Sequence, residues 1–360
     1  MKGTSINPIF RRIAALGGAR NPHVQKYAPV CSAPPALRFI PQIRISGNPL
    51  NLIFRRTTLL LIATGLSINV MAQSTAPVRV GSKIDTEGKL LGQMMVLALE
   101  ANGIKTSSKV SLGNTQVMRG AITAGEIDIY PEYTGNGAFI FAEEKSPVWK
   151  NLQAGYERVK TLDYAKNKIV WLPPAPANNT WTIAVRKDVA TANQLVSLKD
   201  LSRWLASPQY KPGQFKLAAS AEFVERPDAL PAFQAAYSFK LKPDQLLTLA
   251  GGDTAVTIRA AYEKTSGVNA AMAYGTDGAV AALGLVTLAD PQGVQAVYAP
   301  APIVREDALK KNPKIAEVLA PVFKQLDSST LQGLNAKIQL EGQDAKKVAA
   351  DFLQSKGLLK

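Results

Sequence analysis

Cysteine and histidine are almost absent from this sequence of 360 residues, which has one of each. Both lie near the amino terminus, at His23 and Cys31, and neither residue type occurs after Ala72. Thiol nucleophiles, disulfides, histidine-dependent triads and zinc sites built on Cys or His are therefore excluded for residues 73–360. Whatever this part of the chain does, it does with other side chains.

Acidic residues are missing from residues 1–72, which hold nine basic residues and no Asp or Glu. They account for much of the net charge of +15, which comes from 42 basic and 27 acidic residues. Residues 73–360 keep 33 basic against 27 acidic residues, a net charge of +6. Such a charge needs no nucleic-acid partner to explain it. The hydrophobic fraction of 46% excludes general disorder.

A secretory signal peptide is predicted over residues 51–72. Arg55 and Arg56 precede an uncharged run with an apolar centre, and Val70 and Ala72 are the small residues that a signal peptidase reads. A membrane anchor is the alternative, but the apolar part is short and is interrupted by Thr, Ser and Asn. We therefore expect a protein exported to the periplasm of a Gram-negative bacterium.

Residues 1–50 do not fit the usual position of a signal peptide, which begins at the start of the chain. They are basic, free of acidic residues and without a periodic apolar pattern. Two interpretations remain: a start codon assigned too far upstream, or a disordered extension.

Strand and helix patterns alternate along the rest of the chain, which favours an α/β fold around a largely parallel sheet. The first strand leads into a helix that Asp85 and Thr86 can cap and that Asn102 ends. The first strand is expected at 77–83 and further strands at 110–112, 127–130, 180–185, 216–219 and 270–274. Further helices are expected at 115–124, 152–165, 197–206, 227–236, 254–263, 307–326 and 344–354.

Two proline-containing segments, 172–176 and 294–304, predict crossings between two lobes. Lobe 1 would begin with residues 73–177, lobe 2 would comprise 178–295, and residues 296–360 would return to lobe 1. A ligand site is expected in the cleft between the lobes, where strand ends and helix N-termini converge.

Catalytic motifs are lacking after residue 72. The sequence has no phosphate-binding glycine loop with Lys, no Gly-x-Ser-x-Gly elbow and no Ser-x-x-Lys pair there. Paired carboxylates remain, with Asp128, Glu132 and Glu222 as candidates. Asp128 lies within an apolar strand and Glu132 next to a turn, which favours roles in organising the backbone. The sequence therefore predicts a binding protein and not an enzyme.

Several segments place aromatic or charged residues at strand ends, and in this order they resemble the periplasmic substrate-binding proteins of quaternary-amine (glycine betaine/choline) ABC importers. The likeness is greatest to the osmoprotectant-binding branch with Gly-Ser-Lys-Ile-Asp-Thr-Glu-Gly near the mature start, and it extends from Val78 to Lys360. It implies a two-lobed type II periplasmic-binding fold. The segments are 81–83, 130–136, 178–181, 222–226, 273–278 and 297–300.

The resemblance implies an aromatic box for a trimethylammonium group, formed by Tyr133, Trp181, Tyr274 and Tyr298. Trp181 stands where the family often has Tyr. A quaternary ammonium has no N–H, so hydrogen bonds cannot select it, whereas aromatic faces can through cation–π attraction.

For the ligand carboxylate, the resemblance implies Lys83, Asn136 and Arg226, with Glu222 four residues before Arg226 orienting the guanidinium. Asn136 stands where the family often has Thr and still donates a hydrogen bond. An arginine can bind a carboxylate through two N–H groups, and Lys83 adds a point charge.

The predicted function is to capture glycine betaine or a related quaternary amine by lobe closure and to deliver it to an ABC permease with a separate ATPase subunit. The protein would act as a monomer, without a cofactor, a metal or nucleic acid. The alternatives are a binding protein for another small zwitterion such as an amino acid, a small-acid dehydratase on the same fold, and an interaction module fused to a permease.

Overall fold

The computed structural model describes residues 76–359. The predictions for residues 1–50 and for the signal peptide at 51–72 lie outside the described residues. Within the described part, none of the helices combines the length and the apolar character that a bilayer crossing requires.

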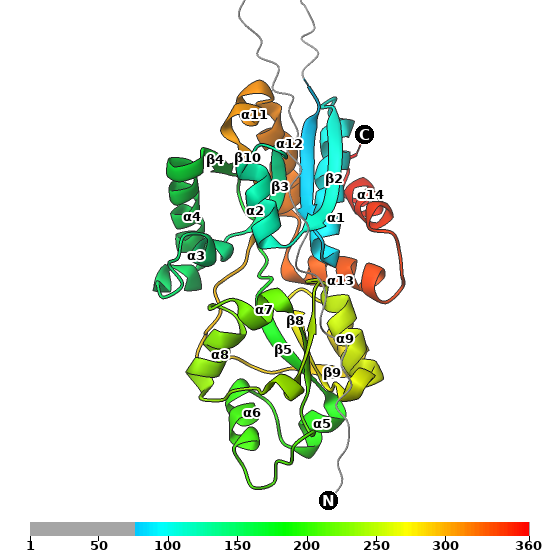
Figure 1. Ribbon diagram of the computed structural model, residues 1–360. Coiled ribbons are helices and arrows are strands. Elements are labelled where there is room, and N and C mark those ends of the chain that lie inside the picture. Colours follow the sequence, from blue (N-terminus) through cyan, green and yellow to red (C-terminus); the bar gives the residue numbers. More distant parts are fainter. Residues whose placement is uncertain (1–75, 360) are drawn as a thin grey trace, which may run out of the picture. The chain divides into compact units, whose positions relative to one another are not determined.

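Two five-stranded sheets organise residues 76–359, and the strands of each form a separate group in Figure 1. Sheet A has the order β2-β1-β3-β10-β4, and sheet B has the order β7-β6-β8-β5-β9. The strands are β1 (Val78–Lys83), β2 (Thr106–Gly113), β3 (Ile129–Tyr133), β4 (Ile169–Trp171), β5 (Trp181–Arg186), β6 (Leu217–Ser220), β7 (Leu246–Leu249), β8 (Ala270–Tyr274), β9 (Leu285–Thr287) and β10 (Pro300–Arg305).

The prediction of a largely parallel sheet is wrong in one respect, because each sheet is mixed. In sheet A, β1 is parallel to β2 and β3, whereas β10 is antiparallel to β3 and β4. In sheet B, β6 is parallel to β7 and β8, whereas β5 is antiparallel to β8 and β9. Strand β5 follows the first proline-containing segment, 172–176, and β10 contains the two prolines of the second, Pro300 and Pro302.

Helices connect the strands, and α1 is the most deeply packed of those around sheet A. Its residues Leu90, Leu91, Met94 and Met95 have no exposed surface, and the helix contacts α12, α13 and α14. The helices are α1 (Thr86–Ala101), α2 (Thr115–Thr123), α3 (Asn136–Ile140), α4 (Leu152–Asn167), α5 (Lys187–Ala192), α6 (Leu198–Leu205), α7 (Ala221–Glu225), α8 (Leu230–Tyr237), α9 (Thr254–Glu263), α10 (Ala279–Ala282), α11 (Glu306–Lys311), α12 (Lys314–Lys324), α13 (Ser328–Gln339) and α14 (Ala345–Ser355).

The carboxyl-terminal region differs from its prediction. A single helix over 307–326 was expected, but α11 ends at Lys311 and α12 begins at Lys314. The break falls at Asn312-Pro313, since proline cannot donate the hydrogen bond that would continue α11. Helix α13 was not predicted at all. It contacts α1, which packs on sheet A, and α10, which follows β8 of sheet B.

Candidate functional site

Strand ends bring four of the predicted side chains to corresponding edges of the sheets. Lys83 ends β1, Tyr133 ends β3, and Tyr274 ends β8. Trp181 begins β5 and pairs directly with Tyr274. Because β5 is antiparallel to β8, its first residue lies beside the last residue of β8. The mixed topology of sheet B therefore creates this pair of aromatic rings.

One cavity of the described structure is lined by residues around both sheets and holds about 470 Å³ of empty space, part of it open to solvent. Seven of the eight predicted site residues line it; the exception is Arg226. The seven are Lys83, Tyr133, Asn136, Trp181, Glu222, Tyr274 and Tyr298, and the other lining residues are Ile84, Asp85, Asn114, Thr115, Asn179 and Gly252.

Trp181, Tyr274 and Tyr298 form a contiguous group, here called the aromatic cluster. The Trp181 and Tyr274 ring centroids lie 6.3 Å apart with an interplanar angle of 22°, and those of Trp181 and Tyr298 lie 5.6 Å apart at 59°. Phe223 supports Trp181 with an edge contact at 5.7 Å. The ring faces are electron-rich, so a cation in this part of the cavity would be attracted to them.

Tyr133 lines the same cavity but already has a charged neighbour. The Lys83 Nζ lies 4.8 Å from its ring centroid, and its hydroxyl donates to Glu87 Oε1 at 3.0 Å. Burial raises the pKa of both Tyr133 and Tyr274 well above the ordinary value, so these phenols are neutral at neutral pH. The Tyr133 ring therefore already makes a cation–π contact with Lys83 of the protein itself.

Glu132, which lies behind the cavity wall, organises Lys83 and Asn136. Its Oε1 accepts from Lys83 Nζ at 2.6 Å, from Asn136 Nδ2 at 2.7 Å and from the Tyr133 backbone N–H at 2.8 Å. Its Oε2 accepts from the Tyr130 hydroxyl at 2.7 Å. The prediction that Glu132 organises backbone is confirmed for the Tyr133 N–H alone, because the other three donors are side chains. Lys83, Glu132 and Asn136 are here called the polar cluster.

The charge of Glu132 is compensated inside the protein. Burial alone would raise the pKa of this carboxyl group, but Lys83 and the hydrogen bonds outweigh burial and hold the pKa below its ordinary value. Lys83 and Asn136 each donate once to Glu132, although an ammonium has three donor hydrogens and an amide has two. Both groups can therefore donate to a ligand in the cavity.

Arg226 was predicted to bind the ligand carboxylate through two N–H groups, but in the structure these groups bind another residue of the protein. Its Nε and Nη2 donate to the two oxygens of Asp228, at 2.9 and 2.6 Å. Its Nη1 donates to Asn136 Oδ1 at 2.9 Å and to Glu222 Oε1 at 3.0 Å. The expected contact between Glu222 and Arg226 is therefore present, whereas the paired N–H face is occupied by Asp228.

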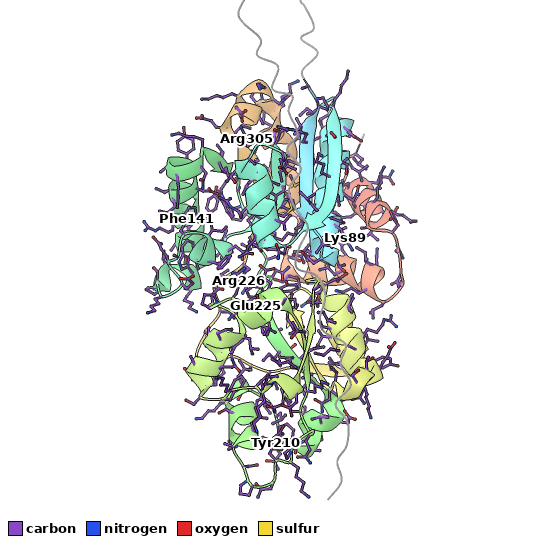
Figure 2. The ribbon with its side chains drawn as sticks, in the orientation of Figure 1. Lys89, Phe141, Tyr210, Glu225, Arg226 and Arg305 are labelled. Carbon is purple, nitrogen blue, oxygen red and sulfur yellow. The ribbon has the colours of Figure 1, made fainter. Side chains whose placement is uncertain are left out.

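Two aromatic rings enclose the Arg226 guanidinium, whose Cζ lies 4.2 Å from the ring centroid of Phe139 and 4.5 Å from that of Trp181. The residue is only 4% exposed. Figure 2 labels Arg226 between the part of the chain around sheet A, where Arg305 is labelled, and the part around sheet B, where Tyr210 is labelled. Its position lets one side chain support both Asn136 and the aromatic cluster.

Two further buried carboxylates, which sequence reasoning missed, lie near the cavity without a cation as hydrogen-bond partner. Glu87 accepts from Tyr133, from Asn179 Nδ2 at 2.7 Å and from Asn335 Nδ2 at 2.8 Å. Asp277 supports the aromatic cluster, since it accepts from the Tyr274 backbone N–H at 2.6 Å.

The donors around Asp277 are all neutral, because the carboxyl group also accepts from the Thr254 hydroxyl at 2.8 Å and from Gln339 Nε2 at 2.7 Å. Burial raises its pKa to about 7, with the hydrogen bonds opposing the shift and Glu87 adding to it. Asp277 is thus a buried acid that forms no ion pair with a basic group of residues 76–359.

Sequence signals existed for some of these residues. Asp277 lies within the Tyr-Gly-Thr-Asp-Gly segment, and Asp228 follows Arg226 by two residues. Asn335 and Gln339 carried no such signal, because they reach the site from α13, which was not predicted. Asp85 was predicted only as a helix cap, and it is the N-cap of α1.

The chain is similar to known substrate-binding proteins. The family model described as "Substrate binding domain of ABC-type glycine betaine transport system" matches residues 76–355. The chain is 65% identical over 294 residues to the "Glycine betaine-binding protein YehZ" of Escherichia coli (strain K12), covering 82% of this chain and 95% of that protein. It is 32% identical over 304 residues to the "Glycine-betaine-binding protein" of Pseudomonas aeruginosa, covering 84% of this chain and 94% of that protein.

Solved structures agree with the fold. The structure of apo YehZ from E. coli matches with 66% identity and a TM-score of 0.58, covering 79% of this chain and 99% of that one. A glycine betaine/carnitine/choline ABC transporter structure, at 20% identity and a TM-score of 0.60, covers 79% of this chain and all of that one, and supports the fold alone. The predicted α/β type II periplasmic-binding fold is therefore confirmed, and this chain belongs to the family of substrate-binding domains of ABC-type glycine betaine transport systems.

Proposed function

We propose that this protein captures glycine betaine or a closely related quaternary amine in the periplasm and delivers it to the permease of an ABC importer. Family membership supports the transport role. The ligand class rests on one observation: the aromatic cluster and the free donors of the polar cluster line the same small cavity.

The aromatic cluster would hold the ammonium end of the ligand. A trimethylammonium group offers no N–H, so it gains little from hydrogen-bond acceptors and much from neutral ring faces at van der Waals distance. Trp181, Tyr274 and Tyr298 provide such faces, and each cation–π contact is worth about 0.5–2 kcal/mol. Several such contacts would support roughly micromolar binding after the cost of association.

The polar cluster would hold the carboxylate. Lys83 and Asn136 converge on one oxygen of Glu132, so their remaining hydrogens lie close enough together to bind one carboxylate. Arg226 would act through Asn136, which it holds by the amide oxygen, and Glu222 would act through Arg226. In this proposal Lys83 and Asn136 touch the ligand, while Arg226 and Glu222 position the residues that do.

The remaining parts of the proposal concern export and partners. The leader would be cleaved after Ala72, and the mature protein would work as a monomer with a permease and a separate ATPase. Mass spectrometry of the protein recovered from the periplasm tests the first point: a mature chain that begins at Gln73 is expected, and retention of residues 51–72 would contradict it.

Isothermal titration calorimetry of the purified protein against glycine betaine, choline, proline betaine and a panel of amino acids tests the ligand class. Saturable heat with glycine betaine and none with primary amines is expected. Saturable heat with an amino acid alone would favour the other zwitterion class. Turnover of a small acid that is lost in Glu222→Gln would favour the dehydratase alternative.

A further inference from the structure

Asp85 lines the cavity, and only one of its two carboxylate oxygens accepts a hydrogen bond from the described residues. It follows β1 and caps α1, and its Oδ1 accepts the Gly88 backbone N–H at 2.8 Å. Among residues 76–359, no hydrogen bond to its second oxygen, Oδ2, is present. The residue lines the cavity together with Tyr133 and the aromatic cluster and is 8% exposed. A capping role alone therefore leaves one carboxylate oxygen of a buried side chain without a partner.

The charges around Asp85 do not balance it. Lys83, on β1, is bound to Glu132 at 2.6 Å. Glu87, on α1, and Asp253, at the start of α9, are additional anions, and Lys89 Nζ, also on α1, lies 3.9 Å from Asp253 Oδ2. The Tyr133 and Tyr274 phenols that face Asp85 from β3 and β8 are neutral. The surroundings of Asp85 thus contain more negative than positive charge.

The acidity of Asp85 agrees with this geometry. Burial raises its pKa to about 6, with Glu87 and Asp253 adding to the shift while the Gly88 N–H and Lys83 oppose it. The carboxyl group is therefore ionised mainly at neutral pH and above. An anion in this setting gains when a cation without a counter-charge enters the cavity.

We propose that Asp85 is a specificity-determining residue that faces the ligand ammonium and favours quaternary amines with a net positive charge. The inference rests on the proposed function and refines its substrate class. For a cation such as choline, Asp85 supplies attraction alone. For a zwitterion such as glycine betaine, attraction to the ammonium is partly offset by repulsion of the carboxylate a few ångströms away.

Asp85→Asn separates this role from helix capping. Asparagine is as good an N-cap as aspartate, and its amide oxygen can still accept the Gly88 N–H. The matched control is Asp344→Asn, because Asp344 caps α14 in the same way, by accepting the Lys347 N–H at 3.0 Å, and does not line the cavity.

The test is titration calorimetry with choline and glycine betaine on the native protein and both variants at pH 7.5. We expect Asp85→Asn to weaken choline binding at least tenfold and glycine betaine binding threefold or less, with no change in Asp344→Asn. At pH 5, where Asp85 is largely protonated, the native protein should lose most of its preference for choline over glycine betaine relative to pH 7.5. The change in Asp85→Asn should be smaller, since Asp277, which titrates in the same range, is present in both proteins.

Three outcomes would decide against the inference. Equal losses for the two ligands, unchanged binding of both in Asp85→Asn, or a native protein that binds glycine betaine and not choline would each overturn it. A native protein that binds neither compound, nor any other quaternary amine, would instead overturn the proposed function.

Discussion

The aromatic cluster and the polar cluster each rest on a buried carboxyl group, and the two groups have opposite pKa shifts. Asp277, behind Tyr274, has its pKa raised to about 7, whereas Glu132 has its pKa lowered. Burial alone would raise both, so burial is not the cause of the difference. Glu132 has the ammonium of Lys83 at 2.6 Å, while the donors to Asp277 are neutral. The presence of a cation in the protein decides the direction.

This difference indicates how each side of the cavity will respond to change. The charges of the polar cluster are balanced within the fold, so removing one member leaves a buried partner uncompensated. The aromatic cluster is built from neutral rings, so removing one member leaves no buried charge uncompensated. On the aromatic side, the positive charge that would balance the nearby carboxylates is expected to come from the ligand.

The largest expected effect is on the polar cluster. Glu132→Gln should lower the free energy of unfolding by about 3–5 kcal/mol, because it leaves the Lys83 ammonium buried without a counter-charge. Urea denaturation measures the change. The matched control is Glu143→Gln, which removes an exposed ion pair with Arg158 and should cost at most about 1 kcal/mol. If Glu132→Gln lost no more unfolding free energy than Glu143→Gln, the proposed difference between the polar cluster and the aromatic cluster would be wrong.

The next effect concerns pH and the support of the aromatic cluster. Because the pKa of Asp277 is raised on folding, its contribution to stability is complete below the ordinary aspartate pKa near 4 and is lost as the pH rises through about 7. Between pH 5 and pH 8 the unliganded native protein should lose about 2–3 kcal/mol more of unfolding free energy than Asp277→Asn, because about two pH units of the titration fall in this range. A difference between the two proteins that does not vary with pH would contradict this.

Intermediate effects are expected for the rings themselves. Trp181→Ala and Tyr274→Ala should each weaken glycine betaine binding by about 1–3 kcal/mol through lost cation–π and packing contacts. Calorimetry measures the change, and Tyr262→Ala, an exposed tyrosine on α9, is the control that should leave affinity unchanged. Unchanged affinity in both cluster variants would remove the aromatic cluster as the ammonium site.

The smallest expected effect is a change in the ratio of the affinities for glycine betaine and choline. Arg226→Ala should weaken glycine betaine binding about tenfold more than choline binding, roughly 1.4 kcal/mol. The reason is that Arg226 fixes Asn136, and only glycine betaine has a carboxylate for Asn136 to bind. Circular dichroism would show whether the variant keeps its fold, since Asp228 loses its partner. Equal losses for both ligands would place the carboxylate elsewhere.

Much of the fold was predictable because the elements concerned have strong local patterns. The helix at Thr254–Glu263 and the strand at Ala270–Tyr274 have the predicted bounds, and Asp85 caps α1 as expected. The antiparallel strands were not predicted, because periodicity reveals that a strand is present but not its direction. Helix α13 was missed although the sequence has a signal for it, since Leu331, Leu334 and Ile338 recur at helical spacing and Asp327 caps the first turn.

The site was predictable where it lies within short motifs at strand ends. Tyr133, Trp181, Tyr274 and Tyr298 fall into this class, and all four line the cavity. Side-chain partners were not predictable, because hydrogen bonds between distant segments leave no trace in local sequence. Asn335 reaches Glu87 across 248 positions of the chain, for example. For the same reason, the use of the Arg226 N–H groups by Asp228 could only be seen in three dimensions.

The most direct test of the central claim is a methylation series measured by calorimetry on the native protein: glycine, sarcosine, dimethylglycine and glycine betaine. These four compounds keep the same carboxylate and differ only in the methyl groups on nitrogen. If ring faces select the ammonium, affinity should rise with methylation and be greatest for glycine betaine. Affinity that is equal across the series, or greatest for glycine, would show that hydrogen bonds select the ligand and would contradict the account.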